Sequence, residues 1–222
     1  MSDMNSNSNS NSNSNSNSNS NMKVIYLDFC HTVVNQFTLG EFIRYVQLRE
    51  CKIFSIFKDR LKNKDIYQRV EGLDPKVYDS LKEYGEKYSN VLIKNNINSV
   101  VLDEIRDLVS DGYKLIVVSA ALKCYIKPFF DNLGLDVYDY ITSKVEKNDG
   151  MLYLDFMYAE RKLDEIMRFE SKQDISKSIA YSDHITDLPM LRHSNEAVVV
   201  KGPNTELLEI AKDKNWRVIN GR

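Results

Sequence analysis

Short apolar runs alternate with helical patterns along most of the chain. Four runs have the length of a β-strand and consist mostly of apolar residues: 23–27, 114–119, 178–182 and 197–200. Between the first two runs, the apolar residues of segment 101–109 fall on one helical face, and Gly112 ends this predicted helix. Continuous apolar strands separated by helices predict an α/β fold, with a Rossmann-like parallel sheet covered by helices on both faces.

One region does not show this alternation of strands and helices. Residues 35–96 contain no convincing central strand and consist of helical, aromatic and charged segments such as "EFIRYVQL" and "PKVYDSLKEYGEKY". An all-helical insertion after the first strand would lie over the carboxyl ends of the sheet strands, where open α/β folds bind ligands. We therefore expect a helical cap at residues 35–96 and an α/β core formed by residues 22–34 and 97–222.

The chain begins with an uninterrupted Asn-Ser alternation over residues 5–21. No side chain in this alternation is apolar, so we expect residues 1–21 to form a disordered low-complexity tail. The formal net charge of −2 indicates neither a nucleic-acid groove nor a polybasic membrane anchor. No apolar run is long enough to span a bilayer. The three cysteines form no CxxC pair, and free thiols favour a cytoplasmic location.

Three predicted strands end in polar residues that can do chemistry. Asp28 follows the first strand, Ser119 ends the second, and the pair Asp183 and Asp187 follows the third. Because the carboxyl ends of parallel strands meet at one sheet edge, we expect these residues to converge there. A carboxylate nucleophile, a hydroxyl at a helix N-terminus and further carboxylates fit a Mg²⁺-assisted phosphoryl-transfer site. Lys162, on a predicted helix, is the best candidate to offset developing negative charge.

Taken one at a time, these residues have ordinary explanations. An aspartate at a strand end is common, Ser119 could simply cap a helix, and Lys162 could lie on a solvated helix face. His31 and His184 stand beside the acidic residues and could form a zinc pair, although Mg²⁺ explains the carboxylates better. Together and in this order along the chain, these residues indicate a phosphoryl-transfer site more specifically than any one of them does alone.

The ordered set resembles the motifs of the haloacid dehalogenase (HAD) superfamily, in particular its phosphoserine-phosphatase-like branch (subfamily IB). The first motif is "VIYLDFCHTVV", the second is "LIVVSAAL", and the third is the lysine in "ERKLDEI". The fourth, "IAYSDHITDLPML", matches the family pattern GDSxxDLPML with Ser182 in place of Gly. The segment "VKGPNTELLEIAKDKNWRVI" is similar to the final helix, Trp and strand of this branch. The resemblance covers Met22 to Arg222, including the expected cap.

This resemblance implies a two-step phosphatase mechanism. Asp28 would attack phosphorus to form an aspartyl-phosphate, which water then hydrolyses. Mg²⁺ would be held by the Asp28 carboxylate, the backbone carbonyl of Cys30 and Asp183, while Asp187 would support the ligands around the metal.

The resemblance also implies a site for the phosphoryl group of a small phosphorylated metabolite. Ser119, Lys162 and the backbone N–H of Ala120 would bind this group. Thr32 would form a hydrogen bond near the nucleophile as part of the same phosphate site.

Cys30 departs from the family pattern, because family phosphatases usually carry Asp there. That Asp protonates the leaving oxygen and then activates water. A thiol with an ordinary pKa of ~8.5 is mostly protonated near neutrality and is a poor base. The backbone carbonyl of residue 30 survives the change, so only the side-chain role is lost. General acid–base assistance is typically worth about 10²–10⁴-fold, so turnover could be slow without being absent.

Three functions therefore compete. The first is a Mg²⁺-dependent phosphatase; similar bacterial proteins with the same Asp-Phe-Cys opening occur in surface-carbohydrate pathways, which favours a sugar- or nucleotide-linked phosphate. The second is a catalytically weak binding or regulatory module, which Cys30 favours. The third is cleavage of a carbon–phosphorus or carbon–halogen bond. Phosphonate cleavage in the superfamily uses a cap lysine, for which Lys52 and Lys58 are available, whereas dehalogenation would leave Asp183 and Asp187 unexplained.

Overall fold

The computed structural model describes residues 21–50, 67–70, 73–95, 97–202 and 205–221. The predicted tail lies outside these residues except for Asn21, and so do Lys52 and Lys58. Within the described ranges, no helix is long and apolar enough to cross a membrane.

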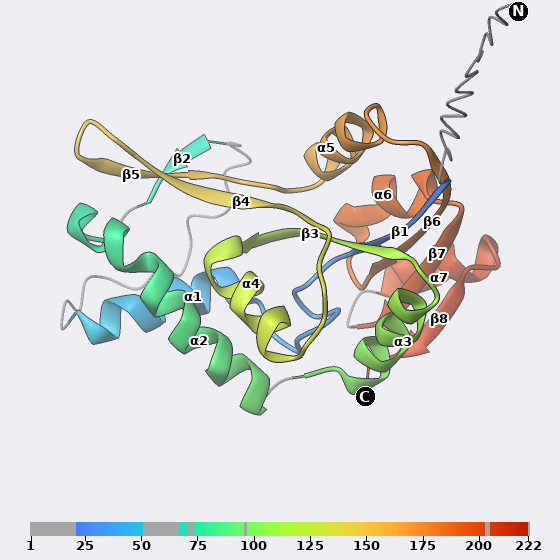
Figure 1. Cartoon of the computed structure of the whole chain (residues 1–222), viewed down its shortest axis with the longest axis horizontal. Helices are drawn as coiled ribbons and strands as arrows, with labels where there is room; N and C mark the ends of the chain where they lie inside the picture. The colour runs from blue at the N-terminus through green and yellow to red at the C-terminus, as the bar shows by residue number, and fades with distance from the viewer. Residues whose placement is uncertain (1–20, 51–66, 71–72, 96, 203–204, 222) are drawn as a thin grey trace, which may run out of the picture.

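A single sheet organises the described part of the chain. Its strands are β1 (Met22–Leu27), β2 (Tyr67–Arg69), β3 (Lys114–Leu122), β4 (Asp139–Asn148), β5 (Met151–Asp155), β6 (Ile175–Ser182), β7 (Glu196–Lys201) and β8 (Arg217–Asn220). Their spatial order is β2-β5-β4-β3-β1-β6-β7-β8 (Figure 1). Neighbouring strands from β4 to β8 are parallel, whereas the β4–β5 and β5–β2 pairs are antiparallel. The predicted α/β class with a parallel sheet core is confirmed.

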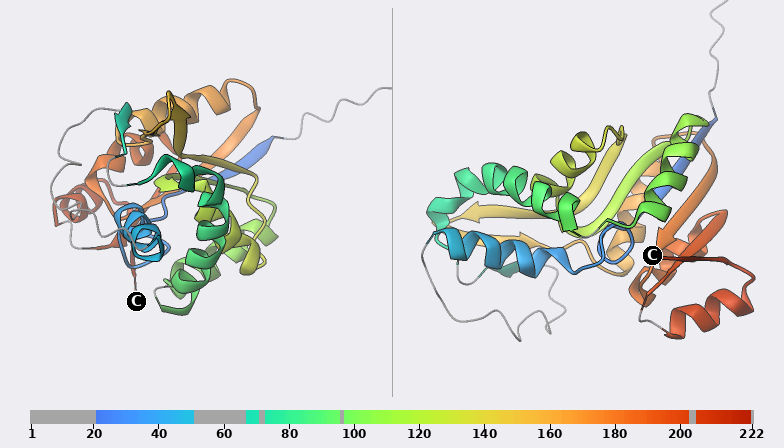
Figure 2. Two further views of the ribbon diagram at one scale, coloured as in Figure 1. Left: turned by 90° about the vertical axis from the view of Figure 1, so that its left-hand side faces the viewer. Right: turned by 90° about the horizontal axis from the view of Figure 1, so that it is seen from below.

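Helices cover both faces of this sheet (Figures 1 and 2). They are α1 (Thr38–Arg49), the 3-10 helix η1 (Pro75–Ser80), α2 (Leu81–Asn95), α3 (Ser99–Ser110), α4 (Lys123–Asn132), α5 (Glu160–Glu170), the 3-10 helix η2 (Ile185–Asp187), α6 (Leu188–His193) and α7 (Thr205–Asp213). Side chains of α1 to α4 belong to one apolar cluster, and those of α5, α6 and α7 belong to a second cluster.

The apolar strands contribute alternate side chains to these two clusters. In β1, Ile25 and Leu27 belong to the first cluster, while Val24 and Tyr26 belong to the second, and all four are completely buried. Because both faces of the strand are covered, neither set of alternate positions can be polar. This is the physical reason for the continuous apolar runs in the sequence.

The β4–β5 hairpin was not predicted. Its two-residue turn is Asp149–Gly150, and both residues have positive φ angles, +48° and +71°. Asn148 and Met151 pair on either side of the turn. An Asp-Gly pair in this conformation is the preferred chemistry for a two-residue hairpin, so the dipeptide was the available sequence signal.

The segment predicted to be an all-helical cap contains α1, η1 and α2, but it also contains β2. This strand pairs with β5, so the all-helical expectation is wrong at Tyr67–Arg69. Figure 1 shows α1, α2 and the end of the hairpin grouped beside the sheet core. The role of this segment as a cap stays a prediction.

Helix α2 packs closely against the start of α4 at Gly85. A Cβ atom added at Gly85 would lie 2.2 Å from the backbone carbonyl oxygen of Cys124. Real Cβ atoms do not approach backbone atoms so closely, so a side chain here would have to push the helices apart. Glycine is therefore required for this contact between α2 and the core.

We expect Gly85→Ala to lower the free energy of unfolding by about 1–3 kcal/mol, because overpacking outweighs the better helix propensity of Ala. Gly40→Ala in α1 is the matched control, since its Cβ would lie no closer than 3.6 Å to the Phe37 ring. The control should be neutral or gain up to about 1 kcal/mol. Urea unfolding of both variants measures the difference; equal stability of the two would contradict the close-packing account.

Candidate active site

Three buried carboxylates meet at the carboxyl edge of the sheet. Asp28 directly follows β1, Asp183 directly follows β6, and Asp187 lies in η2. Since β1 and β6 are parallel neighbours, their ends lie side by side, and the N–H of Asp28 donates to the Tyr181 carbonyl at 3.0 Å. The three acidic residues are only 5%, 3% and 2% exposed. The fold thus brings together carboxylates from two distant parts of the chain.

Lys162 joins these carboxylates from helix α5. Its Nζ lies 2.7 Å from Asp28 Oδ1 and 2.8 Å from the Asp187 carboxylate. The residue is 4% exposed, so it does not lie on a solvated helix face. Burial acts to lower the pKa of Lys162, but the charges of Asp187 and Asp28 outweigh it and raise that pKa. The ammonium group is therefore charged and shared between two acids.

The loop after β1 adds Thr32 to the site. Its Oγ1 lies 3.2 Å from Asp28 Oδ2 and 3.3 Å from Asp183 Oδ1, as a donor shared between them. Asn98 caps α3 and also holds this loop, because its Nδ2 donates to the Thr32 carbonyl at 3.0 Å. The turn is completed by His31, which adopts a left-handed φ of +58°. Thr32 thus helps to orient two of the three carboxylates.

Ser182 has a role that the sequence analysis did not predict. Its Oγ donates to Asp187 Oδ2 at 2.7 Å and accepts from the His184 N–H at 3.2 Å. The residue is completely buried, so its hydroxyl holds the carboxylate that also meets Lys162. The Gly of the family motif would leave Asp187 with one donor fewer.

Ser119 lines the same pocket, but it does not lie at a helix N-terminus as expected. Strand β3 continues to Leu122, and α4 begins only after it. The pairing register of β3 with β4 shifts between Ser119 and Leu122, and the N–H of Ala121 donates to Ser119 Oγ at 3.3 Å. The helix-terminus interpretation is therefore wrong. Ser119 and Ala120 reach the pocket from an irregular strand end instead.

Cys30 is part of a buried chain of hydrogen bonds. Its Sγ lies 3.1 Å from Thr38 Oγ1, and that hydroxyl lies 2.9 Å from the Tyr125 hydroxyl. Burial raises the pKa of the Cys30 thiol to about 12, and the charge of Asp28 contributes to the rise. The thiol is therefore neutral near pH 7, and it connects the loop after β1 to α1 and α4.

The two histidines next to the acidic residues also line the pocket. Burial and the charge of His184 lower the pKa of His31, and His184 Nδ1 lies 2.9 Å from Thr186 Oγ1. Among the described residues, no group of three or more His, Cys, Asp or Glu side chains is arranged as a metal cluster. A zinc site needs such a set of protein ligands, so the geometry does not favour the zinc pair.

Magnesium makes a different demand on the protein. Mg²⁺ is usually bound through one or two carboxylates together with waters and substrate phosphate oxygens, not by an all-protein cage. When ionised, the three carboxylates carry three negative charges against the single positive charge of Lys162. Burial, followed by the charges of Asp28 and Asp187, raises the pKa of Asp183 to about 7. A divalent cation would relieve this excess of buried negative charge.

The backbone of Gly202 packs closely against the Asp183 carboxylate. A Cβ added at Gly202 would lie 3.1 Å from Asp183 Oδ2, so glycine keeps the neighbourhood of this oxygen free of a side chain. Asp28, Asp183 and the backbone carbonyl of Cys30 are the groups that would hold Mg²⁺. Asp187 is already engaged by Lys162 and Ser182.

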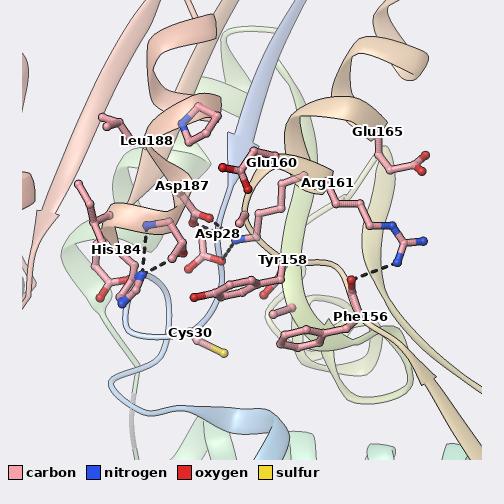
Figure 3. A pocket seen from close by; sticks show the side chains of 18 of the residues that line it. Asp28, Cys30, Phe156, Tyr158, Glu160, Arg161, Glu165, His184, Asp187 and Leu188 are labelled. Carbon is pink, nitrogen blue, oxygen red and sulfur yellow. Dashed lines mark hydrogen bonds and ion pairs between the residues drawn. The ribbon is translucent and has the colours of Figure 1, made fainter. Parts of the chain in front are cut away.

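These polar groups line a pocket of about 1500 Å³, larger than the roughly 300–1,000 Å³ of common small-molecule sites. Figure 3 shows Asp28 and Asp187 together in this pocket, with Tyr158 and Phe156 beside them. Tyr158, Phe156 and Phe37 all line the pocket, and the sequence analysis singled out none of them. No motif or periodicity marks these aromatic residues, because their role depends on the pocket.

Comparison with known families gives one match over most of the chain. Residues 25–192 match a model of haloacid dehalogenase-like hydrolases. A 53-residue stretch is 45% identical to a histidinol-phosphatase of Neisseria meningitidis serogroup C (strain 8013). That alignment covers 24% of this chain and 23% of the relative, so the chain matches about a quarter of the relative's length.

Several solved structures share the fold. A protein of unknown function from Bordetella pertussis Tohama I has a TM-score of 0.67 at 17% identity, covering 91% of this chain and all of that one. A phosphoserine phosphohydrolase-like protein from Francisella tularensis subsp. tularensis SCHU S4 has a TM-score of 0.61 at 19% identity, with coverage of 89% and 95%. A phosphoserine phosphatase described as a phospho-aspartyl intermediate analogue has a TM-score of 0.57 at 19% identity, with coverage of 91% and 94%.

The raised pKa of Asp183 predicts opposite effects of pH on the metal-free and the Mg²⁺-loaded protein. Without metal, the raised pKa stabilises the fold at low pH. This contribution should be lost as the pH rises from about 4, the ordinary Asp pKa, to about 7. Mg²⁺ needs the ionised carboxylate, so the increase in melting temperature on adding Mg²⁺ should be larger at pH 8 than at pH 6.

Thermal unfolding with Mg²⁺ and with EDTA at both pH values measures this difference. Asp183→Asn is the control, because its amide does not titrate, and the Mg²⁺ effect should become small at both pH values. An equal Mg²⁺-induced shift at pH 6 and pH 8 in the unmodified protein would contradict the assignment of Asp183 as a ligand.

Proposed function

This chain belongs to the haloacid dehalogenase-like hydrolase family, and we propose that it is a Mg²⁺-dependent phosphatase that hydrolyses a small phosphomonoester through an aspartyl-phosphate. One observation carries the proposal: a buried lysine links the Asp28 carboxylate to Asp187 at the pocket, with Asp183 beside them. A carboxylate held in this way is oriented and accessible for attack on a phosphoryl group.

In the first step, a carboxylate oxygen of Asp28 attacks phosphorus, and the bond from phosphorus to the leaving oxygen breaks. The leaving alkoxide takes up a proton to become the free alcohol. In the second step, water attacks the phosphorus of the aspartyl-phosphate and releases inorganic phosphate. The water loses a proton, and Asp28 returns to its carboxylate form.

The other residues bind and orient the reacting groups. Lys162 would offset the negative charge that develops on the phosphoryl oxygens. Ser119 and the N–H of Ala120 would donate hydrogen bonds to the same oxygens, while Thr32 would orient the carboxylates of Asp28 and Asp183. When bound by Asp28, Asp183 and the carbonyl of residue 30, Mg²⁺ supplies charge neutralisation and polarisation of the phosphoryl group.

Cys30 cannot supply the proton transfers at an ordinary rate, because its thiol has a pKa of about 12 and is already bonded to Thr38. Proton transfer to the leaving group would then come from water, from the substrate itself or from His31, which lines the pocket. We propose that the enzyme is consequently slow on alkyl phosphates, and faster on substrates whose leaving group needs no proton.

Two similarities bear on the substrate class. The matched relative is named histidinol-phosphatase, but over only 53 residues, and a sugar- or nucleotide-linked phosphate from surface-carbohydrate metabolism rests on the first motif alone. We further propose that residues 35–96 act as a cap that selects the leaving group. Cys30 and Cys124 are free thiols, which supports the cytoplasm as the location.

A binding or regulatory module without turnover is the second candidate, and the neutral thiol of the partly buried Cys30 is the observation that favours it. If the catalytic activity had been lost, selection would no longer maintain a cluster of buried charges whose desolvation lowers the stability of the fold. The cluster of Asp28, Lys162, Asp183 and Asp187 therefore favours the enzyme.

We expect Asp28→Asn to lower phosphatase turnover by at least about 10³-fold, because the amide is not a nucleophile. The measurement is Mg²⁺-dependent release of phosphate from aryl and alkyl phosphates. Beryllium fluoride with Mg²⁺ should raise the melting temperature of the unmodified protein but not that of the variant. Asp103→Asn, at an exposed position paired with Arg106, is the control and should leave both readouts unchanged. Full activity in Asp28→Asn would refute the aspartyl-phosphate mechanism.

A second prediction concerns Cys30→Asp. The new carboxyl group would stand where Thr38 can donate a hydrogen bond to it, and it could protonate the leaving oxygen. Turnover of alkyl phosphates should rise by about 10-fold or more, while turnover of aryl phosphates should change little, since aryl oxides leave without protonation. Cys30→Asn is the control, because an amide of the same size transfers no proton. If Cys30→Asp slows both substrate classes alike at saturating Mg²⁺, the thiol has a positive function and this account of it is wrong.

A further inference from the structure

We infer that the pocket beside the carboxylates contains a stacking subsite for a flat aromatic or heteroaromatic ring on the leaving group of the substrate. The subsite, here called the ring subsite, consists of the stacked pair Tyr158 and Phe156; Phe37 lines the same pocket. This inference rests on the proposed function, because it assigns the part of the same pocket that the phosphoryl group does not fill.

The first argument is the distribution of chemistry in the pocket. The acidic and basic groups of the catalytic site are buried, whereas Tyr158 and Phe37 are 40% and 41% exposed. Large aromatic side chains left this open to water inside a concave site usually meet an apolar part of a ligand. The pocket volume leaves ample room for such a group next to a phosphoryl group.

The second argument is that the ring subsite is already ordered. The rings of Phe156 and Tyr158 are stacked, with their centroids 5.3 Å apart and their planes 12° from parallel. Between them, the N–H of Met157 donates to Ser143 Oγ at 2.9 Å, and the Met157 side chain is buried. This anchoring fixes the segment between β5 and α5 from the core side.

Arg161 fixes the same segment from its helical end. Its guanidinium pairs with Asp155 and donates to the Phe156 carbonyl at 3.1 Å (Figure 3). A stacking surface held on both sides loses little conformational entropy when a ligand binds, so a ring can gain affinity there. Asp28 and Cys30 line the same pocket as the stacked pair, so a ring bound there would belong to the leaving group of the phosphoester that Asp28 attacks.

The third argument is that the charged residues of the pocket do not select for a charged leaving group. The pocket lining includes Glu160 and Asp164, but it also includes Arg192 and Arg168. Since charges of both signs line the pocket, they favour neither a cationic nor an anionic leaving group. The flat apolar surface is the feature that discriminates between leaving groups.

The test compares two non-hydrolysable ligands, 2-phenylethylphosphonate and n-butylphosphonate, by calorimetry with the full chain and Mg²⁺. Both carry the same charged head group, and only the first has a ring. We expect the ring ligand to bind at least about 10-fold more tightly to the unmodified protein, as one favourable stacked contact allows. Tyr158→Ala should reduce this ratio to about 2-fold or less, and Tyr158→Phe should keep it.

Tyr138→Ala is the matched control, because Tyr138 is 46% exposed and does not line the pocket; its ratio should equal that of the unmodified protein. Equal affinities of the two phosphonates, or a ratio that survives Tyr158→Ala, would overturn the inference. Turnover of acetyl phosphate, which has no ring, tests the proposed function separately. If turnover depends on Asp28 but the two phosphonates bind equally well, only the ring subsite is refuted. If the ring ligand binds more tightly but no substrate is turned over, the phosphatase assignment is refuted and the ring-binding pocket stands.

Discussion

The ion pairs of Lys162 are the interaction on which the rest of the site depends. A buried ammonium is stable only with charged or polar partners, and those partners, Asp28 and Asp187, follow β1 and β6. The lysine itself comes from α5 on one face of the sheet. Two strands and one helix must therefore reach their final positions together before the charge is compensated, which couples the order of the fold to the geometry of the site.

This compensation is incomplete, and the remaining charge explains why the site suits a cation. Lys162 supplies one positive charge to three carboxylates, and burial, followed by the charges of Asp28 and Asp187, raises the pKa of Asp183. Thr32 and Ser182 add neutral donors that orient the carboxylates without changing the charge. The result is a hydrogen-bonded group of acids whose excess negative charge the proposed divalent ion would offset.

The backbone carbonyl and the side chain of Cys30 have different proposed roles. Its backbone carbonyl is a proposed ligand for the metal, whereas its side chain belongs to a neutral chain of hydrogen bonds with Thr38 and Tyr125. Those partners lie in α1 and α4, so the thiol contributes to the junction between the core and the segment predicted to be the cap. A residue that transfers protons there would have to share the same hydroxyl groups.

The α/β class and the location of the site could be predicted from the sequence, because two-sided burial makes strands continuously apolar and parallel strands end at one edge. The Asp149–Gly150 dipeptide is a sequence signal for the turn of the β4–β5 hairpin, which the sequence analysis did not predict. Other features were decided by the tertiary structure alone: the burial of Lys162, the bond from Ser182 to Asp187 and the stacked aromatic pair. Lys162 meets Asp28 and Asp187 only once α5 packs beside the strand ends. The Ser182–Asp187 bond and the Phe156–Tyr158 pair join residues close in the sequence, but they lie in irregular segments whose conformation no periodic pattern predicts.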